Sequence, residues 1–332
     1  MHGVDSRALQ ARAYLAQRHR WRLGEALPWA LAIAAFFAFP NSVFVGTQVL
    51  ILVLFALSLD LILGYAGIVT LGHAAFFGIG AYAAGGLSAH LGWNEPLSGL
   101  LFAGVCAGVI GVVSGAILLR YHGLALIMLT LAMGIMLQEA GNAWDSFTGG
   151  YDGLYGIKPA PLLGRFENDL YGYHYYWYAL IVLLLMFLLS RRVVHSPFGA
   201  SLLGIRENPA RMPAIGCAVL WRKIVVYTLS AFMAGLAGGL FAQSNAYVTL
   251  EVFSFARSGT VLIVLILGGT GRLYGAFLGG AIYYLLEHNL AKLSPEFWQF
   301  GVGLVLLGVV SLRHNGLLGL QEHLLQRIRR RT

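Results

Sequence analysis

Ten long apolar stretches follow one another along the chain, and they constrain its fold more than any other feature of the sequence. They lie at residues 27–45, 47–63, 71–90, 97–119, 121–141, 174–190, 223–246, 259–271, 274–291 and 297–312. A membrane-spanning helix needs about 20 mostly apolar residues. Only 11% of the 332 residues are charged, which is too few to cover a water-soluble protein. The sequence therefore predicts an all-α, polytopic membrane helix bundle with about ten transmembrane segments (8–10), and it excludes a disordered chain or an ordinary soluble enzyme.

The basic residues predict how these segments are oriented. An even number of spans places both termini on one side, and 18 of the 22 Lys and Arg residues then fall on that side. Because basic loops are enriched on the cytoplasmic side of a membrane, both termini are expected in the cytoplasm. Two spans remain open between a full crossing and a re-entrant segment. They are the short stretch 259–271 and the stretch 71–90, which begins among glycines.

The chain divides into three parts. Residues 1–26 form a basic tail, read as retained and cytoplasmic because no small-residue cleavage site follows a short apolar core. Residues 27–312 form the transmembrane domain, and residues 313–332 form a second basic cytoplasmic tail. Within the domain, an external loop is expected at 143–173 and a charged cytoplasmic segment at 191–222.

Motifs for chemistry are missing from the sequence. None of the three lysines completes the phosphate-binding pattern G-x-x-x-x-G-K-[ST], and no H-E-x-x-H or zinc-type Cys/His spacing occurs. Cys106 and Cys217 are far apart and predict no disulfide framework. We therefore expect no catalytic residues, no metal site and no cofactor in this chain. The net charge of +8 fits basic loops beside membrane lipid, and no nucleic-acid partner is expected.

The stretch from Gly64 to Tyr82, GYAGIVTLGHAAFFGIGAY, combines five glycines with one histidine, His73. Glycines disfavour a smooth helix, so the stretch is expected either to break and line a cavity or to allow close helix packing. For His73 the structural reading, a hydrogen bond to a backbone carbonyl, is favoured over a role in a pathway. A weak internal echo relates Leu63–Tyr82 to Leu267–Tyr284, since both begin Leu-Gly and space glycines through an apolar run.

Several motifs occur in a fixed order over about residues 50–310, and together they resemble one family. They are the stretch 64–85, Leu129–Ala132, Trp144–Leu154, Ser196–Gly199, Ile205–Pro209, Ser230–Gly239 and Leu267–Ala276. The ordered set resembles the LivM-type permease subunits of the branched-chain amino acid ABC importers. The resemblance implies a transport subunit of the bacterial inner membrane rather than an enzyme, with residues 27–312 as the permease domain.

The resemblance also implies partners. They are a LivH-type sister permease, two cytoplasmic ATPase subunits of the LivG and LivF type that hold ATP and Mg, and an external or periplasmic solute-binding protein. The implied solutes are branched-chain or related amino acids. Urea, short amides and aromatic or organic acids remain alternatives within the family. An ion-gradient-driven secondary transporter is the alternative from another class, disfavoured because the span centres offer only His73 as an ionisable group.

Two sets of site residues follow. The first is the coupling helix that the resemblance places at 196–208 to contact the ATPases, where Pro197 favours a helix start and Pro209 its end. Its residues are Ser196, Pro197, Phe198, Gly199, Arg206, Glu207 and Asn208. The alternative is a juxtamembrane loop that contacts lipid headgroups. The second set is the expected solute pathway, made of Thr70, His73, Phe76, Phe77, Thr130 and Gln138.

Three further positions carry expectations. Asp60, near the inner end of its span, is expected to meet a neighbouring polar group. Glu287 and His288 are expected at the membrane interface, with a proton relay as the alternative. In the external loop, the glycine-dense part 144–154 is expected to dock the binding protein or to gate the cavity.

Overall fold

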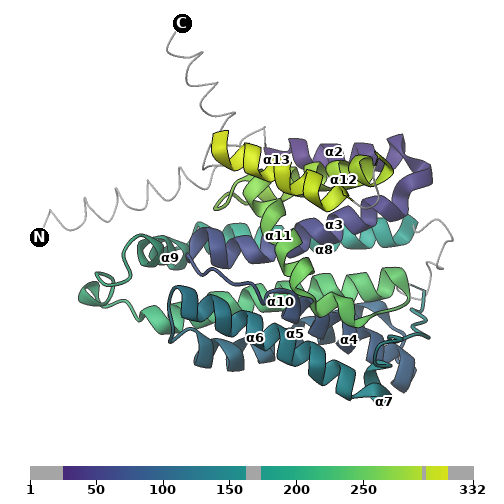
Figure 1. The fold of residues 1–332 in the computed structure, drawn as a ribbon, viewed down its shortest axis with the longest axis horizontal. Helices are drawn as coiled ribbons and strands as arrows, with labels where there is room; N and C mark the ends of the chain where they lie inside the picture. The colour runs from purple at the N-terminus through teal and green to yellow at the C-terminus, as the bar shows by residue number, and fades with distance from the viewer. Residues whose placement is uncertain (1–24, 162–172, 294–296, 313–332) are drawn as a thin grey trace, which may run out of the picture.

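The computed structural model describes residues 25–161, 173–293 and 297–312, and within them the chain is helical (Figure 1). The α-helices are α2 (Leu27–Ala38), α3 (Val43–Asp60), α4 (Ala74–Leu91), α5 (Pro96–Leu118), α6 (Leu124–Ala143), α7 (Asp145–Thr148), α8 (Tyr173–Val194), α9 (Pro197–Glu207), α10 (Val219–Asn245), α11 (Phe255–Gly268), α12 (Gly275–Leu293) and α13 (Trp298–Leu312). No strand is present in the described ranges, although one antiparallel bridge joins Leu154 and Val248. The predicted tails lie outside the described residues, apart from residues 25 and 26, and so does 162–172 of the external loop.

The all-helical prediction is confirmed, and each of the ten predicted stretches contains a helix. Six helices of the described chain are long and apolar enough to cross a membrane. They are Val43–Tyr65, α4, α5, α6, α8 and α10. At 14 residues, α11 is about 21 Å long, which is shorter than the roughly 30 Å hydrocarbon core of a bilayer. The total of ten spans and the cytoplasmic position of the termini stay predictions.

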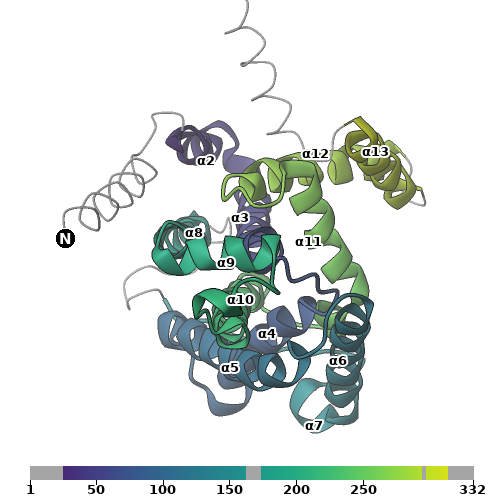
Figure 2. The ribbon, with the colours of Figure 1, turned by 90° about the vertical axis from the view of Figure 1, so that its left-hand side faces the viewer.

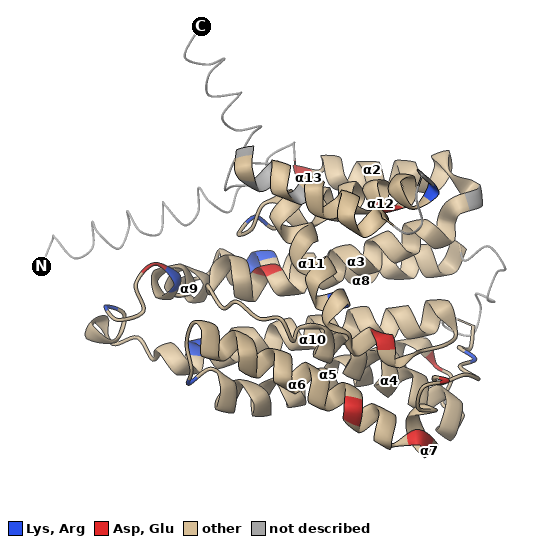
Figure 3. Ribbon diagram, viewed as in Figure 1, with Lys and Arg blue, Asp and Glu red and all other residues tan. Residues whose placement is uncertain are grey.

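Helix α10, the longest of the described helices, lies at the centre of the bundle and packs against α3, α4 and α5. Helix α3 in turn packs against α8 and α12. Figure 1 shows α4, α5, α6 and α10 on one side and α2, α3, α8, α12 and α13 on the other, and Figure 2 shows α11 running between the two groups. Along the ribbon of the described helices, Lys, Arg, Asp and Glu are sparse and lie mainly toward the helix ends (Figure 3).

Glycine permits the close contact between α4 and α10. A Cβ atom at Gly80 would overlap the backbone of Gly235, and one at Gly238 would overlap the carbonyl oxygen of Phe77. In a membrane the surrounding lipid is as apolar as the side chains, so helix association depends on this kind of intimate packing. The close-packing reading of the glycine-rich stretch is therefore correct for its second half.

The first half of the same stretch is broken, as the other reading predicted. Helix α3 runs into a single π-helical segment, Leu61–Tyr65, and residues 66–73 are not helical. Gly67 adopts φ +69°, which a residue with a side chain rarely does. Gly271, at the same offset in the echoed sequence, adopts φ +75° between α11 and α12. The two breaks touch, since the amide nitrogen of Gly271 lies beside Gly64.

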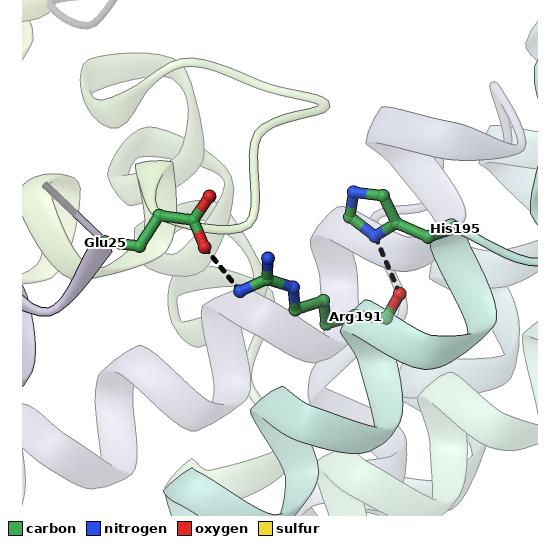
Figure 4. A network of polar contacts seen from close by, with 3 residues as sticks. All are labelled: Glu25, Arg191 and His195. Atoms are coloured by element: carbon green, nitrogen blue, oxygen red, sulfur yellow. Dashed lines mark hydrogen bonds and ion pairs between the residues drawn. The ribbon is translucent and has the colours of Figure 1, made fainter. Parts of the chain in front are cut away.

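A buried ion pair fastens the start of the described chain to α8. Arg191 is 4% exposed and its guanidinium binds the carboxylate of Glu25, while its carbonyl oxygen lies 2.8 Å from Nδ1 of His195 (Figure 4). Trp29 adds edge-on ring contacts to Phe187 and Phe277, with centroids 5.4 and 5.0 Å away. Breaking a buried charge pair is strongly destabilising, so this contact holds α2 against the bundle.

Candidate functional site

A cavity of about 520 Å³ lies between α3, α10, α11, α12 and α13. Its lining comes from residues 48–55 of α3, the first turns of α11 and the last turns of α12. Helix α9 packs against Leu61–Tyr65, at the far end of α3. The cavity therefore sits toward the end of the bundle away from α9. Its volume is in the range of sites for small molecules, about 300–1,000 Å³.

The cavity is lined by both apolar and polar side chains. Ile51, Leu52 and Phe55 of α3 line the apolar part, together with Phe77 and Phe241. The polar part is lined by Gln48, Glu251, Ser254, Arg257, Thr260, Tyr283, Tyr284, Glu287, His288 and Gln299. An amphipathic lining of this kind can take a solute that carries both charge and an apolar side chain.

Arg257 is the cationic group of this cavity. It occupies the first turn of α11, where the Ser254 hydroxyl caps the helix by accepting from the Arg257 amide at 3.3 Å. Its guanidinium carbon lies 5.1 Å from the ring centroid of Phe77 and 4.8 Å from that of Phe241, in the range of cation–π contacts. Packing against these rings therefore holds the side chain at the cavity wall.

The predicted pathway residues fall into two groups. Phe77 lines the cavity, whereas Phe76, His73, Thr70 and Thr130 are buried and do not line it. Gln138 is half-buried on α6, outside the lining. The structure thus brings one member of the predicted set to the cavity, and the role of the others in a pathway stays a prediction.

His73 lies behind the cavity wall. Its ring stacks on Phe55 with centroids 5.3 Å apart, and its Nε2 is 2.8 Å from the Ser58 hydroxyl. The expected partner was a backbone carbonyl, and the structure shows a side-chain hydroxyl instead. Because Phe55 separates the imidazole from the cavity, the contacts of His73 hold α4 against α3.

Thr130 fastens α6 to the broken segment. Its hydroxyl accepts from the amide of Leu71 at 3.3 Å and donates to the carbonyl oxygen of Ile127 at 2.9 Å. A Cβ atom at Gly72 would overlap the Thr130 carbonyl. The Thr130 hydroxyl and the absence of a side chain at Gly72 therefore together allow α6 to lie close to the segment 66–73.

The helix predicted from Pro197 is present as α9. Ser196 is its N-cap and accepts from the Gly199 amide at 3.3 Å, which is how a serine satisfies an unpaired donor at a helix start. At the other end the Asn208 side chain accepts from the Arg211 amide at 3.2 Å. The guanidinium carbon of Arg222 lies 5.9 Å from the ring centroid of Phe198. The residues expected in the coupling helix thus form one capped helix that also contacts α10.

Arg206 and Glu207 point to different surroundings. Arg206 donates from its guanidinium to the carbonyl oxygen of Gly64, in the π-helical segment that ends α3. Asp60, fully buried one turn earlier, accepts from the Gly271 amide at 2.7 Å and so meets the polar group that was expected for it. Glu207 is exposed. We call Asp60, Gly64, Arg206 and Gly271 the α9 junction, because they join α9 to both helix breaks.

The described part of the loop that was predicted to be external folds over the end of α4. The bridge between Leu154 and Val248 is formed by two backbone hydrogen bonds of 2.7 and 3.0 Å. The ring of His90 stacks on Phe147 with centroids 5.1 Å apart. These contacts hold residues 144–161 beside the segment that leads into Glu251, and the proposed docking or gating role of 144–154 stays a prediction.

Sequence reasoning missed the polar lining of the cavity. Arg257 was counted only as a basic residue between two spans, and Glu251 was not considered. A local signal was available, because Ser254 followed by an apolar run is the pattern of a capped helix start. Within the described residues no group of three or more His, Cys, Asp or Glu side chains is placed to hold a metal, and Cys106 and Cys217 are free.

These features define a class: a multi-pass helical membrane protein with an amphipathic cavity and a charged helix at the opposite end. Residues 41–310 match the family described as branched-chain amino acid transport system / permease component. The chain belongs to this family and is therefore an ABC-type permease.

Individual relatives agree with this assignment. The chain is 28% identical to the high-affinity branched-chain amino acid transport system permease protein LivM of Escherichia coli (strain K12), over 87% of this chain and 72% of the relative. The LivM protein of Salmonella typhimurium is also 28% identical, over 84% of this chain and 70% of the relative. The autoinducer 2 import system permease protein LsrC of Enterobacter sp. (strain 638) is 28% identical over 68% and 66%. No solved structure matches the chain.

Proposed function

We propose that this chain is the translocation subunit of an ATP-driven importer of the bacterial inner membrane, and that it carries branched-chain or related amino acids. The family match over residues 41–310 carries the proposal. The cavity supports it, since Ile51, Leu52 and Phe55 offer an apolar wall for an aliphatic side chain and Arg257 offers a charge.

The proposed cycle is alternating access driven from outside the chain. An external binding protein delivers the solute, and a sister permease shares the pathway. Two cytoplasmic ATPase subunits hold ATP and Mg, and their closure moves α9. Capping at Ser196 and the contact of Arg206 with Gly64 support this role, because they let a push on α9 reach the break between α3 and α4.

A second solute class is the alternative within the family. LsrC relatives are named for autoinducer 2 import, so membership alone leaves the solute open. The charged side chains in the cavity favour a zwitterionic solute over urea or a short amide, which carry no net charge to match Arg257.

Purification and reconstitution test the proposal. The tagged chain, extracted from its native membrane in mild detergent, is expected to bring a second permease and two ATPase subunits. In liposomes with the binding protein and internal ATP, the complex is expected to take up leucine, isoleucine and valine. Uptake by the chain alone, without ATP, would identify a secondary transporter and overturn the proposal. Uptake of urea, amides or aromatic acids in place of the amino acids would reassign the solute.

A further inference from the structure

Arg257 is a cation in the cavity that forms no ion pair with any described residue. Its guanidinium rests on the rings of Phe77 and Phe241. A guanidinium stacked on aromatic rings still presents N–H donors along its edge, and that edge binds a carboxylate through two parallel hydrogen bonds. The rings therefore fix the position of the side chain while its donors remain available to an anion.

The helix around Arg257 attracts an anion as well. Arg257 is the third residue of α11, a helix of 14 residues whose N-terminus carries a partial positive charge. A cation in the first turn of a helix is repelled by that charge, which normally favours acidic residues. An anion bound between the guanidinium and the helix N-terminus would remove the repulsion, as anions do at many helix N-termini.

Two carboxylates line the same cavity and complete a site for a zwitterion. Glu251 precedes α11, and Glu287 lies half-buried on α12. Both act electrostatically on Arg257, yet neither is within the 4.0 Å of a salt bridge. The positive and the negative groups thus face the same space without neutralising each other directly. An ammonium group can lie against these carboxylates while an attached carboxylate binds Arg257.

The remaining wall suits an aliphatic side chain. Ile51, Leu52 and Phe55 line it, and none of them adds a charge. The cavity of about 520 Å³ is larger than one amino acid needs, so water remains around the bound groups. A site of this kind binds loosely, which a transport pathway requires because the solute has to leave.

We propose that Arg257 binds the α-carboxylate of the transported amino acid in this cavity, with Glu287 and Glu251 receiving its ammonium group. The permease itself would then select zwitterionic α-amino acids, in addition to any selection by the binding protein. This inference rests on the proposed function, because it names the site at which that transport takes place.

The experiment uses the complete importer in proteoliposomes, supplied with a saturating amount of leucine-loaded binding protein. R257Q is expected to lower leucine uptake about 10- to 100-fold, as the loss of a charge-assisted hydrogen-bonded contact implies. R257K is expected to retain part of the uptake, because it keeps the charge and loses the two-pronged geometry. ATP hydrolysis stimulated by the loaded binding protein is expected to continue in both variants, since the α9 junction is unchanged.

Matched controls separate the site from general effects of charge. Lys292→Gln removes a basic residue from α12 outside the cavity lining, and Glu139→Gln removes an exposed carboxylate from α6. Both are expected to transport at the wild-type rate, whereas Glu287→Gln is expected to lower uptake. If the R257Q complex fails to assemble, R257K and Glu287→Gln decide the question, and wild-type uptake by both would overturn the inference.

A binding measurement gives an independent readout. L-Leucine at millimolar concentration is expected to raise the thermal midpoint of the wild-type complex without binding protein, and R257Q is expected to abolish the rise. 3-Methylbutylamine and 4-methylpentanoate, which each lack one of the two charges, are expected to give no rise. If the wild-type complex transports leucine and R257Q transports it equally well, the inference about Arg257 is overturned while the proposed function stands. Absence of ATP-dependent amino acid uptake by the wild-type complex would overturn the proposed function instead.

Discussion

The two ends of the bundle are built on opposite principles. In the cavity, of about 520 Å³, Arg257 packs on aromatic rings and forms no ion pair with any residue that the structure describes. At the α9 junction, Asp60 and Arg206 bond directly to backbone groups of Gly271 and Gly64. The cavity leaves room and unsatisfied charge for a solute. At the junction the two charged side chains are instead bonded to backbone groups, so the junction can pass a displacement from α9 to the two helix breaks.

The largest effect is expected from the glycine packing that joins the two ends. Gly238→Leu forces a side chain into the carbonyl of Phe77 and should separate α4 from α10. Overpacking of this kind costs about 1–3 kcal/mol, or more where backbone blocks the way. We expect loss of the monodisperse peak in size-exclusion chromatography. Gly303→Ala, on α13 with nothing within 4 Å of the added Cβ, is the control. A stable Gly238→Leu protein would show that the close contact between α4 and α10 at Gly238 is not needed to hold the bundle together.

Asp60→Ala should break the junction while leaving the cavity intact. It leaves the Gly271 amide without its acceptor, at a cost of about 1–3 kcal/mol. Transport per ATP hydrolysed is expected to fall along with the thermal midpoint. Asp60→Asn keeps an oxygen that can accept from the same amide. Its transport per ATP hydrolysed and its thermal midpoint should lie between those of Asp60→Ala and the wild type. Equal transport by Asp60→Ala and wild type would argue against a transmitting role for the junction.

Glu207→Lys should act at the outer surface of α9 without disturbing the fold. The side chain is exposed, so the free energy of unfolding is expected to change by less than about 0.5 kcal/mol. We expect fewer ATPase subunits to copurify and solute-stimulated ATP hydrolysis to be lost. Glu139→Lys, another exposed carboxylate on a helix, controls for the added charge. Intact coupling in Glu207→Lys would contradict the assignment of α9 as the coupling helix.

The smallest effect is expected at His73. His73→Gln alters the contact with the Ser58 hydroxyl and should cost about 1 kcal/mol of stability. Because Phe55 lies between His73 and the cavity, the leucine concentration for half-maximal uptake is expected to stay unchanged. A large shift in that concentration would place His73 in the solute pathway, as one reading of the sequence had it.

Sequence patterns predicted the elements of this protein better than their contacts. The helical stretches, the break near Gly67 and the helix at Pro197 each follow from local rules, because apolar length, glycine and proline act within a few residues. The sequence did not predict Arg257 as a site residue, because its position in the cavity depends on packing against Phe77 and Phe241, which lie on other helices. No local sequence pattern predicts a contact between side chains of three different helices.

The same division holds for α9. That residues 196–208 form a short charged helix was readable from Ser196, Pro197 and Pro209. That Arg206 bonds to the Gly64 carbonyl was not readable, since Arg206 and Glu207 are neighbouring charges that are both exposed. By itself the sequence determined a helical membrane permease, because apolar length and motif order are local properties of the chain. Only the tertiary structure decided which charges meet a cavity and which meet backbone, because those contacts join segments up to 211 residues apart.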